Sequence, residues 1–272
     1  MSDAVAVFES AAASLLTEGQ GAGCLPGDAA GVSDAGRCRA HNEDAWLIDP
    51  GLGLLLLADG MGGYNAGEIA SAIAIETLRR SPDPTDVTDQ EALSCARLAD
   101  RVEAANLAIL AAAARRPECL GMGTTLVVAW LSGIHLRYAH VGDSRLYLMR
   151  DSVLTLLTRD HSVGQAMIDA GLADAQAVRQ SRMRGVLTRA LGVEPGVQVD
   201  CAELLLRPGD RLLLCSDGLT DMVADRAIGE ILGAAGSPAD LAQRLLDRAL
   251  RLGGHDNVTA IVLEVARPVT PV

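Results

Sequence analysis

Acidic residues follow apolar runs at several places in this chain. Leu52 to Ala58 is apolar throughout and leads into Asp59 and a glycine-rich stretch. Such a run is typical of a strand that is buried on both faces, and a carboxylate at its end has a rigid base. Asp-Gly after an apolar run is by itself a common turn signal. However, Asp217, Asp143 and Asp256 also lie next to apolar segments. This repetition predicts one shared metal site.

The candidate ligands offer carboxylate oxygens only. No cysteine or histidine stands at a matching position, and oxygen ligands favour Mg²⁺ or Mn²⁺ over zinc. Converging carboxylates repel one another, and two cations about 3.5 to 4 Å apart are the usual solution in phosphoryl chemistry. Arg39 lies three positions before Asn42. Beside such a cluster, an arginine can grip a phosphate through two parallel hydrogen bonds. The acids are Glu43, Asp44, Asp59, Asp143, Asp217 and Asp256.

The composition favours a single globular domain. The chain has 272 residues, of which 49% are apolar, and this is ample for one sizeable core. The net charge of -12 argues against a nucleic-acid surface. No apolar run reaches the roughly 18 to 20 residues of a membrane span. The N-terminus has no basic start, and the six cysteines form no C-x-x-C pair. We therefore expect a cytoplasmic monomer with free thiols and with no nucleic-acid or membrane partner.

The positions of the first two acids follow from a predicted hairpin. A strand around Ala45 to Ile48 should pair with Leu52 to Ala58 through the intervening Asp-Pro-Gly turn. Asp44 stands where the first of these strands begins, and Asp59 stands where the second is expected to end. The two carboxylates should therefore lie at the same end of the hairpin.

The remaining elements come in blocks of helices and blocks of strands, which predicts an α+β fold with helices outside antiparallel sheets. Gly123 to Arg150 has the pattern of an antiparallel meander of three strands. Residues 164–184 have weak periodicity and predict a surface segment. Helices are expected over Ala66 to Arg80, Asp89 to Arg115 with a capping box at Thr88 to Glu91, Val163 to Ala170, Arg226 to Leu232 and Ala239 to Leu252, and strands from Ala30 and over Val153 to Thr158, Cys201 to Leu206, Arg211 to Ser216 and Val258 to Val265.

Eight short motifs together resemble the bacterial branch of the protein phosphatase 2C family, over about Gly31 to Val265. Each motif is weak by itself, but eight in the family's order are highly specific. The motifs are R-x-x-N-E-D (Arg39 to Asp44), D-G-M-G-G (Asp59 to Gly63), G-T-T (Gly123 to Thr125), G-D-S-R (Gly142 to Arg145), D-H-S (Asp160 to Ser162), L-T-R-A-L-G (Leu187 to Gly192), S-D-G-L (Ser216 to Leu219) and D-N-V-T (Asp256 to Thr259).

The resemblance implies an αββα sandwich of two antiparallel sheets flanked by helices, with a metal pair in a channel at one end. Residues 28–267 would form the catalytic domain, with a flap at about 164–185 beside the active site. Outside the region of resemblance, the pattern of residues 1–27 predicts an N-terminal extension made of a short helix and a Gly-rich linker, and residues 268–272 would be a C-terminal tail.

The resemblance also implies hydrolysis of phosphoserine and phosphothreonine in proteins, by direct attack of a water that bridges two Mn²⁺ or Mg²⁺ ions. The partners would be phosphorylated proteins, including a serine/threonine kinase and its substrates. Arg39 would hold the phosphate. The metal pair would be held by Asp44, Asp59, the carbonyl of Gly60, Asp217 and Asp256, with Glu43 acting through water and Asp143 joining Asp217 at a third ion.

Two positions depart from the family pattern. Met61 stands where some members have a histidine that is proposed as the general acid, so the leaving oxygen needs another proton source. Water on a third ion at Asp143 is the first candidate, and His161 is the next, although we interpret His161 as shaping a helix start. Ser181 to Arg184 precedes L-T-R-A-L-G with unexpected residues, which leaves the flap's specificity open.

Two alternative functions remain. The chain could be a phosphatase dedicated to a regulatory partner-switching protein, which would differ only in the flap and the N-terminal segment. A pseudophosphatase scaffold would have lost one or more metal acids. None is lost here, and buried unpaired carboxylates are costly without a metal.

Overall fold

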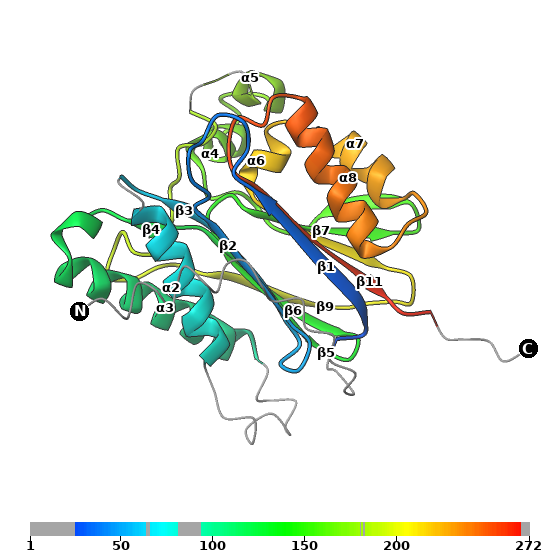
Figure 1. The fold of residues 1–272 in the computed structure, drawn as a ribbon, viewed down its shortest axis with the longest axis horizontal. Coiled ribbons are helices and arrows are strands. Elements are labelled where there is room, and N and C mark those ends of the chain that lie inside the picture. Colours follow the sequence, from blue (N-terminus) through cyan, green and yellow to red (C-terminus); the bar gives the residue numbers. More distant parts are fainter. Residues whose placement is uncertain (1–24, 64–65, 81–93, 180, 182, 268–272) are drawn as a thin grey trace, which may run out of the picture.

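The computed structural model describes residues 25–63, 66–80, 94–179, 181 and 183–267. In this part of the chain, two antiparallel sheets lie face to face (Figure 1). The first sheet has the order β1-β11-β10-β7-β8, with β1 (Gly27–Asp34), β7 (Arg145–Arg150), β8 (Val153–Leu156), β10 (Arg211–Cys215) and β11 (Val258–Val265). The second has the order β2-β3-β5-β6-β9 with β4 beside β3, and comprises β2 (Asp44–Asp49), β3 (Leu54–Met61), β4 (Gly123–Thr124), β5 (Leu126–Ser132), β6 (His135–Val141) and β9 (Asp200–Leu205).

Helices cover the outer face of each sheet (Figure 1). The helices α2 (Ala66–Arg80) and α3 (Cys95–Arg115) pack on the second sheet, and α7 (Asp225–Leu232) and α8 (Pro238–Arg251) pack on the first. Three apolar clusters fill the three gaps between the four layers. The predicted α+β sandwich is therefore confirmed.

β3 is buried on both faces, as its apolar run predicts. Leu54 and Leu56 belong to the cluster under α2 and α3, whereas Leu55 and Leu57 belong to the cluster between the sheets. Successive side chains of a strand point to opposite faces, so both faces need apolar residues here. The prediction that this strand ends at Asp59 is wrong, because the next two residues continue β3 by pairing with β4.

β2 and β3 form the predicted hairpin. Asp44 is the first residue of β2, and the antiparallel register places it opposite Asp59. The hairpin thus brings the two carboxylates to one end of the second sheet.

The predicted three-stranded meander is wrong in its last strand. β5 and β6 pair in the second sheet, but β7 lies between β10 and β8 in the first. The chain crosses between the sheets at Gly142, whose φ of 101° favours glycine. The crossing has a consequence for the site, since it places Asp143 between the two sheets rather than in a hairpin turn.

The prediction for the start of α3 is also wrong. The helix begins at Cys95, where Ser94 caps it by accepting a hydrogen bond from the backbone N–H of Arg97. The expected capping box at Thr88 to Glu91 lies outside the described residues. The short helix expected within residues 1–27 also lies outside the described residues. The other predicted helices agree with the structure within two residues at each end, and so do the strands from β8 to β11.

Short helices that the sequence pattern did not predict include α5 (Ala175–Arg179), α6 (Asp217–Thr220) and the 3₁₀ turn η3 (Pro117–Cys119). Together with α4 (Val163–Asp169), α5 lies in the expected flap, at the same end of the molecule as α6 (Figure 1). None of the helices within the described ranges has the length and apolar character that a membrane crossing requires.

Candidate metal centre

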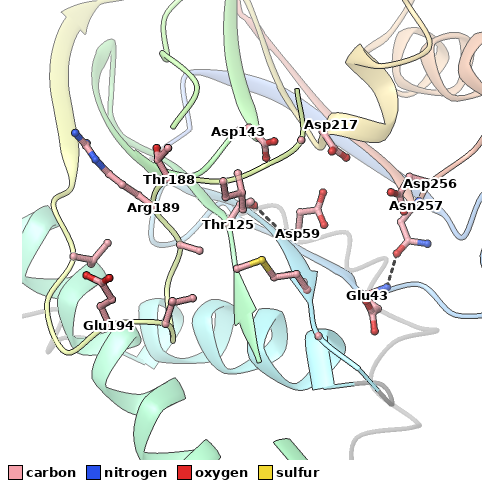
Figure 2. Close-up of a pocket in the computed structure, with 18 of the residues that line it drawn as sticks. Glu43, Asp59, Thr125, Asp143, Thr188, Arg189, Glu194, Asp217, Asp256 and Asn257 are labelled. Atoms are coloured by element: carbon pink, nitrogen blue, oxygen red, sulfur yellow. Dashed lines mark hydrogen bonds between the residues drawn. The ribbon is translucent and has the colours of Figure 1, made fainter. Parts of the chain in front are cut away.

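Five of the six predicted acids line one cavity of about 770 Å³ (Figure 2), and Asp44 is the one that does not. Asp59 lies on β3, Asp217 begins α6 directly after β10, and Asp256 lies in the loop before β11. Asp143 reaches the same cavity from the crossing between the sheets. Arg39, Glu43 and Gly60 also line it. Residues that are far apart in sequence therefore meet at one end of both sheets.

Asp44 is held through one of its two carboxylate oxygens. Its Oδ2 accepts hydrogen bonds from the hydroxyls of Thr259 at 2.6 Å and Ser216 at 2.9 Å. Its Oδ1 is buried and has no hydrogen-bond partner among the described residues. Burial raises the pKa of Asp44 to about 6, although the two hydroxyls act to lower it. A buried oxygen without a donor fits a cation ligand, because an unsatisfied buried acceptor is otherwise costly.

Asp59 and Asp217 are the most strongly perturbed acids of the cavity. Burial raises the pKa of Asp59 well above its usual range, and the charges of Asp44 and Asp217 raise it further. Burial also raises the pKa of Asp217, with Asp143 as the largest of the neighbouring charges. The folded chain thus holds these carboxylates where their ionised forms need a compensating positive charge.

Two threonines fix the backbone of Asp59. The backbone N–H of Asp59 donates to Oγ1 of Thr125 at 3.0 Å, and its carbonyl accepts from the hydroxyl of Thr124 at 2.9 Å. The Thr125 hydroxyl also shares a hydrogen bond of 2.7 Å with that of Ser144, the residue after Asp143. The sequence pattern identifies both threonines only as strand formers. Their supporting role is visible in the sequence only as the G-T-T motif.

Asp143 is buried on the opposite side of Asp59 from Glu43, the residue before β2 (Figure 2). Burial raises the pKa of Asp143 to about 7, and the charge of Asp160 raises it too. Asp160 is itself held by Arg145 through two bonds, from Nε at 2.8 Å and from Nη2 at 2.7 Å. The G-D-S-R and D-H-S motifs therefore support each other across the crossing.

Glu43 and Gly60 are held side by side by backbone contacts. The N–H of Gly60 donates to the carbonyl of Glu43 at 3.2 Å, and the N–H of Glu43 donates to Oδ1 of Asn257 at 2.8 Å. A Cβ at Gly60 would lie 2.2 Å from the carbonyl oxygen of Gly67, so only glycine fits there. Burial raises the pKa of Glu43. Asn257 was not predicted as a site residue, and its only sequence signal is the D-N-V-T motif.

Arg39 lies at the mouth of the cavity, with 55% of its side chain exposed. Its Nη2 donates to Oδ2 of Asp256 at 2.7 Å. The spacing from Asn42 predicts that Arg39 grips a phosphate, and the structure shows it next to the acids with one nitrogen engaged by a carboxylate. A guanidinium has five N–H donors, so this bond orients the group and leaves donors for an anion.

The residues present fit a pair of hard divalent cations. The donor atoms are all oxygens, one of them is a buried orphan, and the pKa values of the acids rise because their charges face one another in a buried site. No histidine lines the cavity in the part of the chain that the structure describes. The predicted ligands are thus brought together. Glu43 and Asp143 lie on opposite sides of Asp59 (Figure 2).

The raised pKa values predict how the stability of the metal-free protein depends on pH. A folded state that raises the pKa of a carboxyl from 3.8 holds its proton more tightly than the unfolded state does, so stability falls as the pH rises through this interval. The interval extends to about 6 for Asp44 and about 7 for Asp143. We therefore expect the Tm in EDTA to be roughly 5 °C or more lower at pH 8 than at pH 5.

The matched measurement adds Mn²⁺ at each pH. Cation binding requires ionised carboxylates, so Mn²⁺ should raise the Tm much more at pH 8 than at pH 5. Differential scanning fluorimetry over both series tests this. A Tm in EDTA that rises with pH, together with an equal Mn²⁺ effect at both pH values, would contradict the assigned cluster.

Comparison with known proteins agrees with the geometry. A family profile described as "Protein phosphatase 2C" matches residues 36–251. The chain is 42% identical over 236 residues to the serine/threonine protein phosphatase PstP of Mycobacterium tuberculosis, a match that covers 86% of this chain and 44% of PstP. It is 35% identical over 237 residues to the serine/threonine phosphatase stp of Listeria monocytogenes, covering 85% of this chain and 93% of that protein. This chain thus spans less than half of PstP but nearly all of stp.

Solved structures show the same arrangement. The crystal structure of PstP superposes with a TM-score of 0.80 at 39% identity, covering 88% of this chain and 99% of that one. The catalytic domain of PstP in complex with two manganese ions superposes with a TM-score of 0.78 at 39% identity, covering 88% and 98%. The chain therefore belongs to the protein phosphatase 2C family, which includes these bacterial serine/threonine phosphatases.

Proposed function

We propose that this chain is a metal-dependent phosphatase that hydrolyses phosphoserine and phosphothreonine in proteins. The observation that carries the proposal is the cavity itself, in which buried oxygen donors with raised pKa values lie beside the guanidinium of Arg39. Oxygen donors suit Mn²⁺ or Mg²⁺, and an arginine suits a phosphate. Family membership and the manganese ions bound by PstP support the same assignment.

The residues proposed to hold the cations come from both sheets. When bound, two such ions neutralise the developing charge on a phosphate and lower the pKa of an attacking water, so that the phosphoester is hydrolysed without a phosphoenzyme. Glu43 would act through water, and Asp143 with Asp217 would serve a third ion. The direct ligands proposed are Asp44, Asp59, the carbonyl of Gly60, Asp217 and Asp256.

The chain's own groups position the phosphate. Asp256 accepts a hydrogen bond of 2.7 Å from Nη2 of Arg39, and this bond holds the guanidinium beside the acids at the mouth of the cavity. The cavity is larger than a phosphoserine side chain needs. Part of its lining comes from one segment of the chain, between Gly185 and Gln198, which we call the second wall. We propose that this wall contacts the residues that flank the phosphorylated one.

The wider biological setting is also a proposal. The expected partners are phosphorylated proteins, including a serine/threonine kinase and its substrates, in signal transduction in the cytoplasm. The catalytic domain would span residues 28–267, with the flap at about 164–185. The names of PstP and stp, both bacterial serine/threonine phosphatases, support phosphorylated proteins as partners.

Replacing Arg39 with Ala should raise KM for phosphopeptides roughly 10- to 100-fold and change kcat less. The lost interaction is a charge-assisted hydrogen-bond pair worth roughly 1.5 to 3 kcal/mol per bond. Steady-state kinetics with a phosphopeptide and with an aryl phosphate, together with the inhibition constant of inorganic phosphate, measure the effect. Arg37→Ala is the matched control, because Arg37 is exposed two residues away and does not line the cavity. Unchanged KM and unchanged phosphate inhibition would show that Arg39 does not bind the phosphate.

The test of the proposed function is release of inorganic phosphate from phosphoserine and phosphothreonine peptides and from an aryl phosphate. Each is assayed with Mn²⁺, Mg²⁺, Ca²⁺ or EDTA. We expect hydrolysis with Mn²⁺ or Mg²⁺ and none in EDTA. Failure to hydrolyse any of these substrates with any of the three ions would overturn the proposal.

A further inference from the structure

His161 lies outside the cavity, and both of its ring nitrogens already have partners. Its Nδ1 accepts a hydrogen bond from the backbone N–H of Gly142 at 3.2 Å, and its own backbone N–H donates to the carbonyl of Gly142 at 2.9 Å. Because Nδ1 accepts, the proton of the neutral ring lies on Nε2. His161 is therefore not placed as a proton donor to a leaving oxygen.

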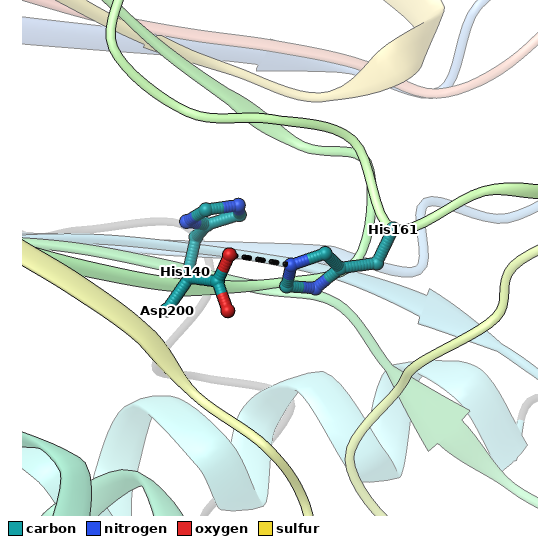
Figure 3. A group of neighbouring side chains, drawn as sticks. All are labelled: His140, His161 and Asp200. Atoms are coloured by element: carbon teal, nitrogen blue, oxygen red, sulfur yellow. Dashed lines mark ion pairs between the residues drawn. The ribbon is translucent and has the colours of Figure 1, made fainter. Parts of the chain in front are cut away.

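The other side of the ring contacts an aspartate and an arginine from two further segments, and Figure 3 shows the aspartate. Nε2 of His161 lies 3.3 Å from Oδ2 of Asp200, the first residue of β9. Nη1 of Arg189 lies 3.1 Å from the same Nε2 and donates to Oδ1 of Asp200 at 2.8 Å. The carbonyl of His161 accepts from the backbone N–H of Thr188 at 2.8 Å. Thr188 and Arg189 belong to the second wall of the cavity.

His140, His161 and Asp200 have nitrogen and oxygen atoms within 4.8 Å of one another, which is close enough to hold a metal ion. Three contacts oppose this use. The guanidinium of Arg189 lies at the same atoms as a fixed positive charge. Nδ1 of His161 accepts from a backbone N–H, so coordination through Nε2 would need a doubly deprotonated ring. Nε2 of His140 contacts the carbonyl of Arg159 at 2.9 Å. The cluster is better suited to fixing the chain than to binding a cation.

The segment that His161 holds is the crossing that carries Asp143. Gly142 packs closely against the second sheet, since a Cβ there would lie 2.6 Å from the side chain of Thr125. On the other side of Asp143, Ser144 is bonded to Thr125 at 2.7 Å. The ring of His161 supports the crossing from the side of the flap and the second wall, by accepting the hydrogen bond from the N–H of Gly142. Its face stacks on the ring of His140 at 4.6 Å.

We propose that His161 is a positioning residue, which holds the Gly142–Asp143 crossing at a fixed place relative to the cavity wall at Thr188 and Arg189. Asp200 orients the ring from the far side. This inference rests on the proposed phosphatase function, since it assigns His161 an effect on catalysis through Asp143. A displaced catalytic group loses rate steeply with distance, so a small movement of the crossing has a measurable effect.

The experiment distinguishes the stacking of the His161 ring from the hydrogen bonds that its nitrogens form. His161→Phe keeps the stacking on His140 and removes both nitrogens, whereas His161→Asn keeps a side-chain oxygen near the position of Nδ1 that can accept from Gly142. With phosphopeptide and saturating Mn²⁺, we expect His161→Phe to lower kcat roughly 10-fold with little change in KM, and His161→Asn to restore most of this loss. His135→Phe, an exposed histidine on β6, is the matched control and should retain wild-type kcat. If His161→Phe does not fold, His161→Gln replaces it, because its longer side chain removes the acceptor from the Nδ1 position.

A double-mutant cycle tests whether the effect passes through Asp143. In an Asp143→Ala background, His161→Phe should lower kcat by less than about 2-fold, since the group it positions is gone. Additive losses, or a His161→Asn variant as slow as His161→Phe, would overturn the inference.

Hydrogen exchange of the Gly142 amide gives a readout that does not need activity. Exchange should be faster in His161→Phe than in the wild type and close to wild type in His161→Asn. If the wild-type protein lacks Mn²⁺-dependent hydrolysis, the proposed function fails whatever the exchange data show. If hydrolysis is present and exchange is unchanged in His161→Phe, the positioning role alone fails.

Discussion

Asp217→Asn is expected to lower kcat at least about 10³-fold on both phosphopeptide and aryl phosphate while the protein stays folded. Asp217 begins α6 directly after the buried strand β10, and its carboxylate faces Asp59 and Asp143 across the cavity (Figure 2). Asparagine keeps the shape and removes the charge. A site built from carboxylates to neutralise two divalent ions then lacks one of its charges, so both cation affinity and turnover should collapse.

The stability of the same variant distinguishes a lost ligand from a damaged fold. Burial and neighbouring acids raise the pKa of Asp217, so in EDTA at pH 8 its replacement by a neutral amide should leave the Tm unchanged or raise it. The rise in Tm that Mn²⁺ causes in the wild type should be largely lost. Asp100→Asn, on the exposed side of α3, is the control and should match the wild type in both respects. Near-normal Mn²⁺-dependent turnover of Asp217→Asn would remove Asp217 from the metal centre.

The second large effect is expected at Asp143, and it should depend on the leaving group. An aryl phosphate releases a phenolate, which is a good leaving group without protonation. A serine alkoxide is strongly basic and must be protonated as it leaves. Met61 lines the cavity where a general acid could stand, and no histidine lines it in the described chain. Asp143 is the buried acid proposed to serve a third ion together with Asp217, and water held by that ion would be a source of the proton.

Asp143→Ala should therefore slow phosphopeptide hydrolysis roughly 10²- to 10⁴-fold, and aryl phosphate hydrolysis far less. The measurement is kcat for both substrates at saturating Mn²⁺, after the manganese content has shown that the pair of ions is still bound. An equal drop for both substrates would mean that Asp143 serves the attacking water or the ion pair instead of the leaving group.

The parts of this fold that follow from local pattern are predictable from the sequence. The unbroken apolar run before Asp59 specifies a strand with two buried faces, and the Asp-Pro-Gly turn fixes the pairing that sets Asp44 opposite Asp59. Helix periodicity gives α2 over its full length. Five acids of the cavity were predicted from the sequence, because carboxylates next to apolar segments recur and their motifs occur in a specific order. Glu194 also lines the cavity and was not predicted.

The parts that depend on tertiary contacts are not predictable in this way. The pattern after Gly142 is that of another hairpin, and only the packing of β7 between β10 and β8 sends it to the other sheet. The hydroxyls that hold Asp44 come from Ser216 and Thr259, which are ordinary strand-end residues by pattern. The pairing of His161 with Asp200 joins residues of different elements and leaves no periodic signal.

The most direct test of the central assignment is the number of Mn²⁺ ions bound per chain, measured by equilibrium dialysis with elemental analysis in the wild type and in Asp217→Asn. If the buried carboxylates hold the catalytic ions, the wild type binds at least two Mn²⁺ per chain, with half-saturation in the range where turnover appears, and Asp217→Asn loses both binding and turnover. Binding of fewer than two ions by an active wild type, or full binding by Asp217→Asn, would contradict the account.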